Sequence, residues 1–170
     1  HATILGATAC KSVEDIGNPI DLAIITTRPA LLPDLLKRCA RSGIHNVAIT
    51  TPFGSDRSGA VQTRKTLEIA RRYGLRLLGP ASYGIARPAI RLNATLSGIP
   101  VAPGHLALVS QSASVCATTL DWASANRVGF SCVAGPGGTY DIRFGAILDY
   151  LAGDTETRAI AVWVANGRNA

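Results

Sequence analysis

The sequence predicts an α/β protein built from repeated strand–helix units around parallel sheets. Short apolar runs of the length of a buried strand alternate along the chain with longer segments whose apolar residues recur every three or four positions. Strands that alternate with helices at this spacing are typical of βαβ units with right-handed crossovers. The chain of 170 residues is 47% apolar and 16% charged, which supplies enough apolar material for a folded core.

A first series of units is predicted between residues 21 and 78. Its strands are expected over residues 21–26, 46–51 and 76–78, and its helices over residues 29–42 and 60–73. Pro29 suits a first helical turn. Gly43 and Gly74 suit the position just after the last residue of a helix.

Residues 84–104 break this pattern. Proline and glycine punctuate the segment, and Ile90, Leu92 and Leu96 alternate, so we expect an irregular strand followed by a linker between domains. A single domain remains an alternative.

A second series of units follows the linker. Its strands are expected over residues 106–110, 129–133 and 159–164, with a helix from a Ser112 or Ser114 cap to about Asn126 and another from an Asp141 cap to Leu151. No G-x-G-x-x-G turn opens the chain, and the chain ends directly after a strand. We therefore expect a piece of a longer protein.

Composition excludes several classes of partner. The net charge is +6, but the basic residues are scattered and aromatic residues make up only 5%, so nucleic-acid binding is not expected. No apolar run reaches the roughly 18 residues that a membrane span needs, and no signal peptide is visible. The four cysteines form no C-x-x-C pair and lie in or beside apolar segments, which predicts reduced thiols, no metal site and a cytoplasmic location.

Candidate binding residues lie where the predicted strands end, because ligands of parallel sheets collect at that edge. The strongest candidate is the segment from Ser110 to Ser114, where a strand runs directly into the start of a helix. A helix N-terminus carries unpaired N–H groups and partial positive charge, which suits a phosphoryl group. A serine cap with no ligand is the alternative. The sequence contains no motif for a catalytic residue, whether a triad, a carboxylate pair or a Walker A loop.

Three segments in order resemble the NDP-forming acyl-CoA synthetases, the family of the succinyl-CoA synthetase α-subunit. They read LRLLGPASYGIARPAIRLNATLS, GHLALVSQSASVCATTLDWASANRVGFS and DIRFGAILDYLAGDTETRAIAVWV, and the similarity extends from about Ile4 onward. The resemblance implies a CoA-binding Rossmann-like domain over residues 1–97, without its first strand and Gly-rich turn. It implies the first half of a flavodoxin-like ligase domain over residues 98–170.

The resemblance also implies roles for individual residues. Coenzyme A or acyl-CoA would contact the strand ends and the loop before them at Thr27, Pro29, Ile49, Thr50, Thr51 and Ser82. The phosphoryl group of a phosphohistidine would be received at Ser110, Gln111, Ser112 and Ser114. That histidine would lie beyond Ala170, and ATP or ADP would bind an ATP-grasp module outside this chain. Association into homo-oligomers is expected, because both ends would leave apolar faces open.

Some positions depart from the family pattern. The G-P-N-C-x-G loop reads Gly79-Pro-Ala-Ser-Tyr-Gly84, the Gly-Asn pair reads Gly137-Gly138, and the glutamate near the phosphohistidine falls at Ala165. These losses leave two functions open. One is the CoA and phosphoryl half of an acyl-CoA synthetase. The other is a non-catalytic region that senses acyl-CoA beside a GNAT domain in a protein lysine acetyltransferase.

Overall fold

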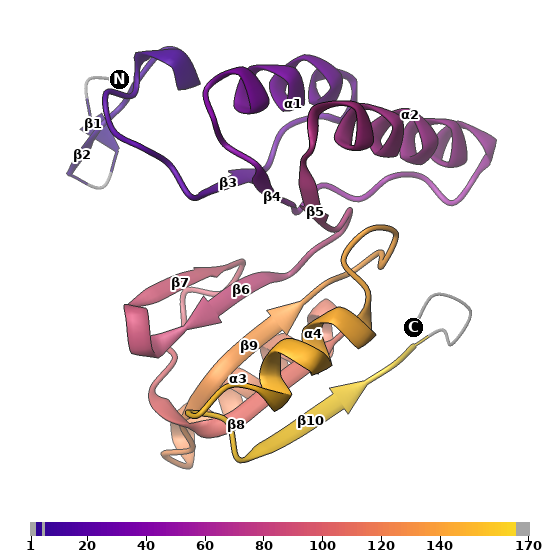
Figure 1. Ribbon diagram of the computed structural model, residues 1–170. Helices are drawn as coiled ribbons and strands as arrows, with labels where there is room; N and C mark the ends of the chain where they lie inside the picture. The colour runs from indigo at the N-terminus through magenta and orange to yellow at the C-terminus, as the bar shows by residue number, and fades with distance from the viewer. Residues whose placement is uncertain (1–2, 5, 166–170) are drawn as a thin grey trace.

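The computed structural model describes residues 3–4 and 6–165, and within them the chain forms two α/β units joined by a short connection (Figure 1). The first unit holds strands β3 to β5 with helices α1 and α2, and the second holds β6 to β10 with α3 and α4. Ahead of them, β1 (Thr3–Ile4) and β2 (Ala7–Thr8) pair as a small antiparallel hairpin. In this described part of the chain, no helix is both long enough and apolar enough to cross a membrane.

The first unit is a parallel sheet, as the sequence predicts, and its strand order is β3-β4-β5. Its elements are β3 (Leu22–Ile25), α1 (Leu32–Arg41), β4 (Asn46–Ile49), α2 (Arg57–Tyr73) and β5 (Arg76–Leu78). Both helices lie on the same face of the sheet (Figure 1), because two right-handed crossovers that step in one direction place their helices on one side.

Local chemistry sets the ends of these helices. The expected helix from Pro29 starts as a 3-10 turn and becomes an α-helix at Leu32. Helix α2 starts before the expected residue 60, because the Asp56 side chain accepts a hydrogen bond from the Gly59 amide at 2.9 Å and caps the first turn. It ends at Gly74, whose φ of 65° is a left-handed conformation that glycine adopts without strain.

The second unit is a mixed five-stranded sheet in the order β10-β8-β9-β6-β7. Its strands are β6 (Gly84–Arg87), β7 (Leu92–Thr95), β8 (Pro103–Ser110), β9 (Phe130–Gly135) and β10 (Ala159–Trp163). Strands β8, β9 and β10 are parallel, as expected.

The expected irregular strand within residues 84–104 is wrong. Residues 84–95 form the hairpin β6–β7, and β6 pairs antiparallel with β9. Gly84 permits the close pairing, because a Cβ atom there would lie 2.0 Å from the carbonyl oxygen of Ala94. The sequence concealed this hairpin because a 3-10 turn at Pro88–Ile90 interrupts the alternation of apolar residues.

Helices α3 (Ala113–Ala125) and α4 (Phe144–Ala152) cover opposite faces of the second sheet (Figure 1). Ser112 caps α3, as predicted, by accepting a hydrogen bond from the Val115 amide at 3.3 Å. The predicted Asp141 cap of α4 is wrong, because that helix begins only at Phe144 and has no side-chain cap. The Asp141 carboxylate instead accepts a hydrogen bond from the Leu77 amide at 2.7 Å, across the boundary between the units.

A shared apolar core joins the two units. Ala48 and Leu78 of the first sheet pack in one buried cluster with Val109, Cys132 and Ile147 of the second unit. Burial of apolar surface is the main favourable term in folding, so this cluster couples the stability of both units. The relative position of the two sheets is therefore set by packing as well as by the chain connection.

Candidate functional site

Strand ends of the two units meet where the chain passes from one unit to the other, since Gly79 after β5 bridges Thr139 after β9. The first edge is defined as the carboxyl ends of β3, β4 and β5, at residues 26–28, 50–52 and 79–82. The second edge is defined as the carboxyl ends of β8, β9 and β10, at residues 110–112, 136–139 and 164–165. The chain leaves β5 at the first edge and enters β6 at Gly84, which pairs with Gly135 at the end of β9. Because β6 runs antiparallel to β9, this short connection brings the first edge against the second.

Ser82 links the two edges directly. Its amide donates to the Ile49 carbonyl at 3.0 Å, and its hydroxyl donates to the Gly135 carbonyl at 2.8 Å. The same hydroxyl accepts from the Gly84 amide at 2.9 Å, and the residue is fully buried. The hydroxyl predicted to contact CoA is thus occupied inside the protein, and it holds the end of β4 close to the end of β9.

The other residues predicted to bind CoA lie together on the first edge. The Thr51 hydroxyl donates to the Thr27 carbonyl at 2.6 Å, and the Thr50 hydroxyl donates to the Ile25 carbonyl at 3.3 Å. Ile49 is buried in the core behind them. The hydroxyl oxygen of Thr27 is itself buried without a hydrogen-bond partner, which marks it as a polar group open to a ligand or a water molecule.

Pro29 begins the turn that follows Thr27. Its carbonyl accepts a hydrogen bond from the Gln62 side chain at 3.0 Å, so helix α2 holds this loop in place. The structure therefore brings Thr27, Pro29, Thr50 and Thr51 into one patch on neighbouring strand ends. Local hydrogen bonds fix the backbone of this patch.

The predicted phosphoryl residues lie on the second edge, at the start of α3. Ser110 is buried, and its hydroxyl both donates to the Ser112 carbonyl and accepts from the Ser112 amide, each at 3.1 Å. The Ser112 and Ser114 hydroxyls lie 3.0 Å apart, and Ser114 is exposed. The turn from β8 into α3 is thus rigid, and it presents the N-terminus of a 13-residue helix.

Gln111 fastens this turn to the neighbouring strand end. Its amide donates to the Trp163 carbonyl at 3.1 Å, and its side-chain oxygen accepts from the Ala165 amide at 2.8 Å. Ala165, which the family resemblance aligns with a glutamate, therefore lies beside the start of α3. A carboxylate at that position would lie close to the predicted phosphoryl site.

A hollow of about 230 Å³ lies where the edges meet. Three segments line this hollow. Phe53 and Asp56 lie just before α2, Pro80 and Ala81 lie in the connection between the units, and Gly138 and Tyr140 lie in the loop after β9. Sequence reasoning missed Phe53, Asp56 and Tyr140 as lining residues. The Asp56-x-x-Gly59 spacing was the available signal, because aspartate commonly caps a helix.

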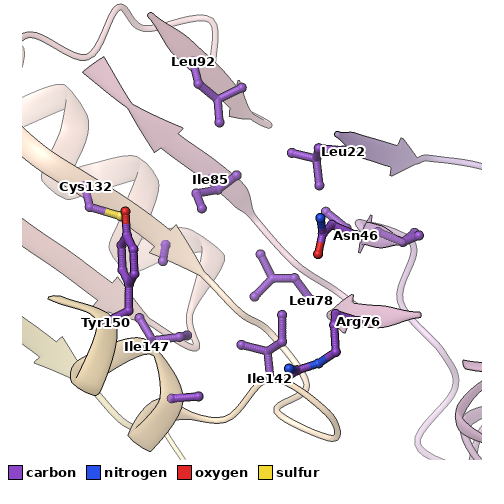
Figure 2. A pocket seen from close by; sticks show the side chains of 14 residues that line it. Leu22, Asn46, Arg76, Leu78, Ile85, Leu92, Cys132, Ile142, Ile147 and Tyr150 are labelled. Carbon is purple, nitrogen blue, oxygen red and sulfur yellow. The ribbon is translucent and has the colours of Figure 1, made fainter. Parts of the chain in front are cut away.

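A second cavity, of about 280 Å³, lies on the other face of the first sheet (Figure 2). Figure 2 shows Leu22, Leu78 and Ile85 pointing into it, with Ile147 and Tyr150 of α4 on the opposite side. The lining is almost entirely apolar, so this space suits neither a phosphate nor a nucleotide. It is a packing gap between the two units rather than part of the site at the edges.

The charged pairs with shifted pKa values lie away from both edges. The Arg38 guanidinium donates to Glu14 and lowers the pKa of that carboxyl to about 2. Hydrogen bonds from Arg87 and Thr157 hold the pKa of Asp154 well below its ordinary value. Among the described residues, no cluster of three His, Cys, Asp or Glu side chains is placed to hold a metal ion. Hydroxyl and backbone groups make most of the hydrogen bonds described at the two edges.

Comparison with known proteins gives the same two parts. Residues 1–88 match the family model of the CoA binding domain, and residues 103–170 match that of the succinyl-CoA ligase like flavodoxin domain. The α subunit of ADP-forming acetate–CoA ligase I from Pyrococcus furiosus is 33% identical over 91% of this chain and 34% of its own length. The matches give no support to the acetyltransferase alternative.

Solved structures agree with the fold. A Pyrococcus horikoshii protein of known crystal structure superposes with a TM-score of 0.92 at 35% identity, over 99% of this chain and 39% of the other. The dinucleotide forming acetyl-coenzyme A synthetase 1 of Ca. Korarchaeum cryptofilum, in complex with phosphate and ADP, superposes with a TM-score of 0.90 at 23% identity. This match covers 99% of this chain and 37% of the other. The chain thus spans about a third of the length of these proteins. It belongs to the NDP-forming acyl-CoA synthetase family, and it corresponds to the CoA-binding α-subunit part of the ADP-forming members.

Proposed function

We propose that this chain is the part of an NDP-forming acid–CoA ligase that binds CoA and receives the phosphoryl group. The observation that carries the proposal is the link through Ser82, whose amide and hydroxyl tie the end of β4 to the end of β9. A reaction between a thiol ester and a phosphoryl group needs both ligands within reach of each other. A fold that places a CoA edge against a phosphoryl edge meets that requirement.

On the first edge, the proposed CoA contacts are Thr27, Pro29, Ile49, Thr50 and Thr51. The unpartnered Thr27 hydroxyl supports this assignment, because a buried polar group without a partner is costly unless a ligand or a water satisfies it. Ser82 is proposed to act on CoA through the backbone that it holds, since its hydroxyl is already paired.

On the second edge, Ser110, Gln111, Ser112 and Ser114 are proposed to receive a phosphoryl group carried by a histidine from another part of the ligase. The helix N-terminus supplies N–H donors and partial positive charge for the anion. Ser110 and Gln111 hold this turn in shape, and the exposed Ser114 hydroxyl is proposed to contact the ligand. No catalytic residue is assigned within the chain itself.

The remaining assignments are also proposals. An ATP-grasp module would supply ATP or ADP, homo-oligomers are expected, and the location is cytoplasmic, in keeping with three buried free thiols. The domain division at residues 1–97 and 98–170 is likewise a proposal from the family resemblance. Hydrogen bonding instead joins residues 84–95 to the sheet of the second unit, through the pairing of β6 with β9.

The test is calorimetric titration of the chain with CoA, acetyl-CoA and, as a control, adenosine. Saturable binding of CoA and acetyl-CoA with none for adenosine is expected, because the edge is proposed to hold phosphates and the pantetheine arm. Failure of both CoA ligands to bind the folded chain would contradict the assignment of the first edge. Incubation with labelled ATP should label no residue, because the acceptor histidine is proposed to lie outside the chain.

A further inference from the structure

The loop between β9 and α4, residues 136–143, lies alongside β5 of the other unit and is called the joint loop here. Thr139 forms a parallel bridge with Gly79, and the Gly138 amide donates to the Pro80 carbonyl at 2.7 Å. The Ile142 amide donates to the Leu77 carbonyl at 3.3 Å. The joint loop therefore extends the first sheet beyond β5 much as another strand would.

Asp141 occupies the central position of this contact. Its Oδ2 atom accepts from the Leu77 amide at 2.7 Å and from the Arg76 Nε at 3.3 Å. The Asp141 carboxylate thus accepts the hydrogen bond from a β5 amide that the backbone carbonyl of a neighbouring strand would otherwise accept. Hydrogen bonds to an ionised acceptor are stronger than those between neutral groups, so this contact is the firmest point of the loop's attachment.

The joint loop is also a wall of the hollow where the two edges meet. Gly138 and Tyr140 line that hollow together with Phe53 and Pro80. The loop follows directly on the end of β9, so its position decides how the second edge lies relative to the first.

From this geometry we infer that Asp141 is a positioning residue: it fixes the joint loop against β5 and thereby aligns the phosphoryl edge with the CoA edge. The expected effect of Asp141 on turnover rests on the proposed function. Its expected effect on the position of the joint loop does not. Asp141 contacts neither edge's proposed ligand residues, so its loss leaves the CoA contacts themselves in place. Loss of Asp141 should therefore slow the reaction step in which CoA on the first edge meets the phosphoryl group on the second edge.

Three substitutions separate the interactions. Asp141→Ala removes the acceptor for both Leu77 and Arg76. Asp141→Asn keeps an oxygen for the Leu77 amide and loses the ion pair, and Arg76→Gln loses the ion pair alone. Asp149→Asn, an exposed position on α4, is the matched control for loss of a carboxylate.

The first measurement is amide hydrogen exchange on the 170-residue chain. Asp141→Ala should raise the exchange rate of the Leu77, Gly138 and Ile142 amides by at least about tenfold, with amides in the core of α3 unchanged. Asp149→Asn should resemble the unsubstituted chain, and Asp141→Asn, which keeps a neutral oxygen as acceptor, should raise these rates less than Asp141→Ala does. Unchanged exchange at Leu77 and Gly138 in Asp141→Ala overturns the inference, as does a uniform rise across the whole chain.

The second measurement is steady-state turnover of the complete ligase. Asp141→Ala should lower kcat by roughly 10-fold to 100-fold, because small misplacements of reacting groups carry costs of that size, while KM for CoA stays within about twofold. Asp141→Asn should restore most of kcat, whereas a merely structural role would move stability alone. An unchanged kcat, or an equal loss in Asp149→Asn, overturns the inference. If the unsubstituted ligase shows no turnover, the proposed function fails, and the exchange experiment alone decides the role of Asp141.

Discussion

The Thr51 hydroxyl donates a hydrogen bond to the Thr27 carbonyl at 2.6 Å, and this contact ties two neighbouring strand ends of the first edge together. Beside it, the Thr27 hydroxyl is buried without a partner. One hydroxyl is thus used to build the edge, while the other makes no hydrogen bond within the described part of the chain. The two threonines, adjacent in space but far apart in sequence, define the part of the site that the first prediction tests.

Thr51→Arg should abolish CoA binding without unfolding the chain. The half-buried Thr51 lies at the mouth of the first edge, and a long charged side chain there would occupy the space proposed for CoA. Calorimetry should show at least a tenfold loss of affinity, about 1.4 kcal/mol. Thr51→Val is the control, since it keeps the shape but removes the bond to Thr27, at a cost of about 1 kcal/mol in stability. An unchanged affinity of Thr51→Arg for CoA would contradict the proposal that CoA binds at the first edge.

Ala81→Gly should stabilise the protein. Ala81 has a φ of 56°, a left-handed conformation that costs a residue with a Cβ atom roughly 1–2 kcal/mol. Glycine avoids this cost but gives the unfolded chain more freedom, so a net gain of about 0.5–1 kcal/mol is expected in chemical denaturation. Ala81→Asn should also stabilise, because asparagine tolerates this conformation better than alanine.

The control for Ala81 is Ala125→Gly, at the end of α3, where glycine should cost about 1 kcal/mol. Equal destabilisation at both positions would show that the backbone of Ala81 carries no strain. The family motif has asparagine at the Ala81 position, and the left-handed backbone gives a physical reason for it.

The ion pair between Arg87 and Asp154 should make stability depend on pH in acid. Arg87 donates to both Asp154 oxygens, at 2.9 and 2.7 Å, and the pair is mostly buried. Because the folded-state pKa of Asp154 is lowered, its contribution is present above the ordinary value of 3.8 and is lost as the pH falls below it. The difference in Tm between the unsubstituted chain and Asp154→Asn should therefore shrink from pH 6 to pH 2.

Glu14 supplies the comparison for this pair. Its pKa is lowered from 4.5 to about 2 by Arg38, so its stabilising effect is lost over that interval. The partners are substantially exposed, so added salt should weaken this contribution more than that of Asp154. A Tm difference for Asp154→Asn that stays constant down to pH 2 would contradict the assignment of the acid dependence to Asp154.

Ala146→Leu should stabilise the protein by partly filling the apolar cavity of Figure 2. Ala146, an exposed residue of α4, is among the residues that line this cavity of about 280 Å³. A leucine there removes apolar surface from water, and a gain of about 1 kcal/mol is expected in urea denaturation. Ala152→Leu, at the exposed end of the same helix, should change stability by less than about 0.5 kcal/mol. A loss at position 146 would mean that the cavity is too narrow for the longer side chain.

One of the four thiols should react rapidly in the folded protein. Cys10 is exposed, whereas Cys39, Cys116 and Cys132 are buried and free. Burial raises the pKa of Cys116 and of Cys132 to about 11, so little thiolate forms at neutral pH. Titration with a coloured disulfide reagent should show a single fast thiol, absent in Cys10→Ser, and full reaction only in denaturant. Rapid reaction of a second thiol would show that the core around it opens readily.

Local chemistry made much of the fold readable from the sequence. The α2 stop at Gly74, the Ser112 cap of α3 and the parallel direction of β3, β4 and β5 follow from spacing and from side chains a few residues apart. The patch of Thr27, Thr50 and Thr51 was also predictable, because parallel strands bring their carboxyl ends to one edge. These features need no knowledge of distant contacts.

The roles of Ser82 and Asp141 could not be predicted in the same way. Ser82 was expected to contact CoA, yet its hydroxyl bonds to Gly135; Asp141 was expected to cap α4, yet it bonds to Leu77. In each case the partner lies more than fifty residues away in sequence, and local pattern carries no information about it.

The sequence by itself determined the α/β class, the order of its units, the C-terminal ends of the helices and the family. The tertiary structure alone decided that residues 84–95 form a hairpin on the second sheet and that this hairpin turns the two edges toward each other. Helix periodicity and capping act over a few residues, so composition and spacing reveal them. The meeting of two sheet edges depends on pairing and packing between segments far apart in the chain, and only the folded protein brings those segments together.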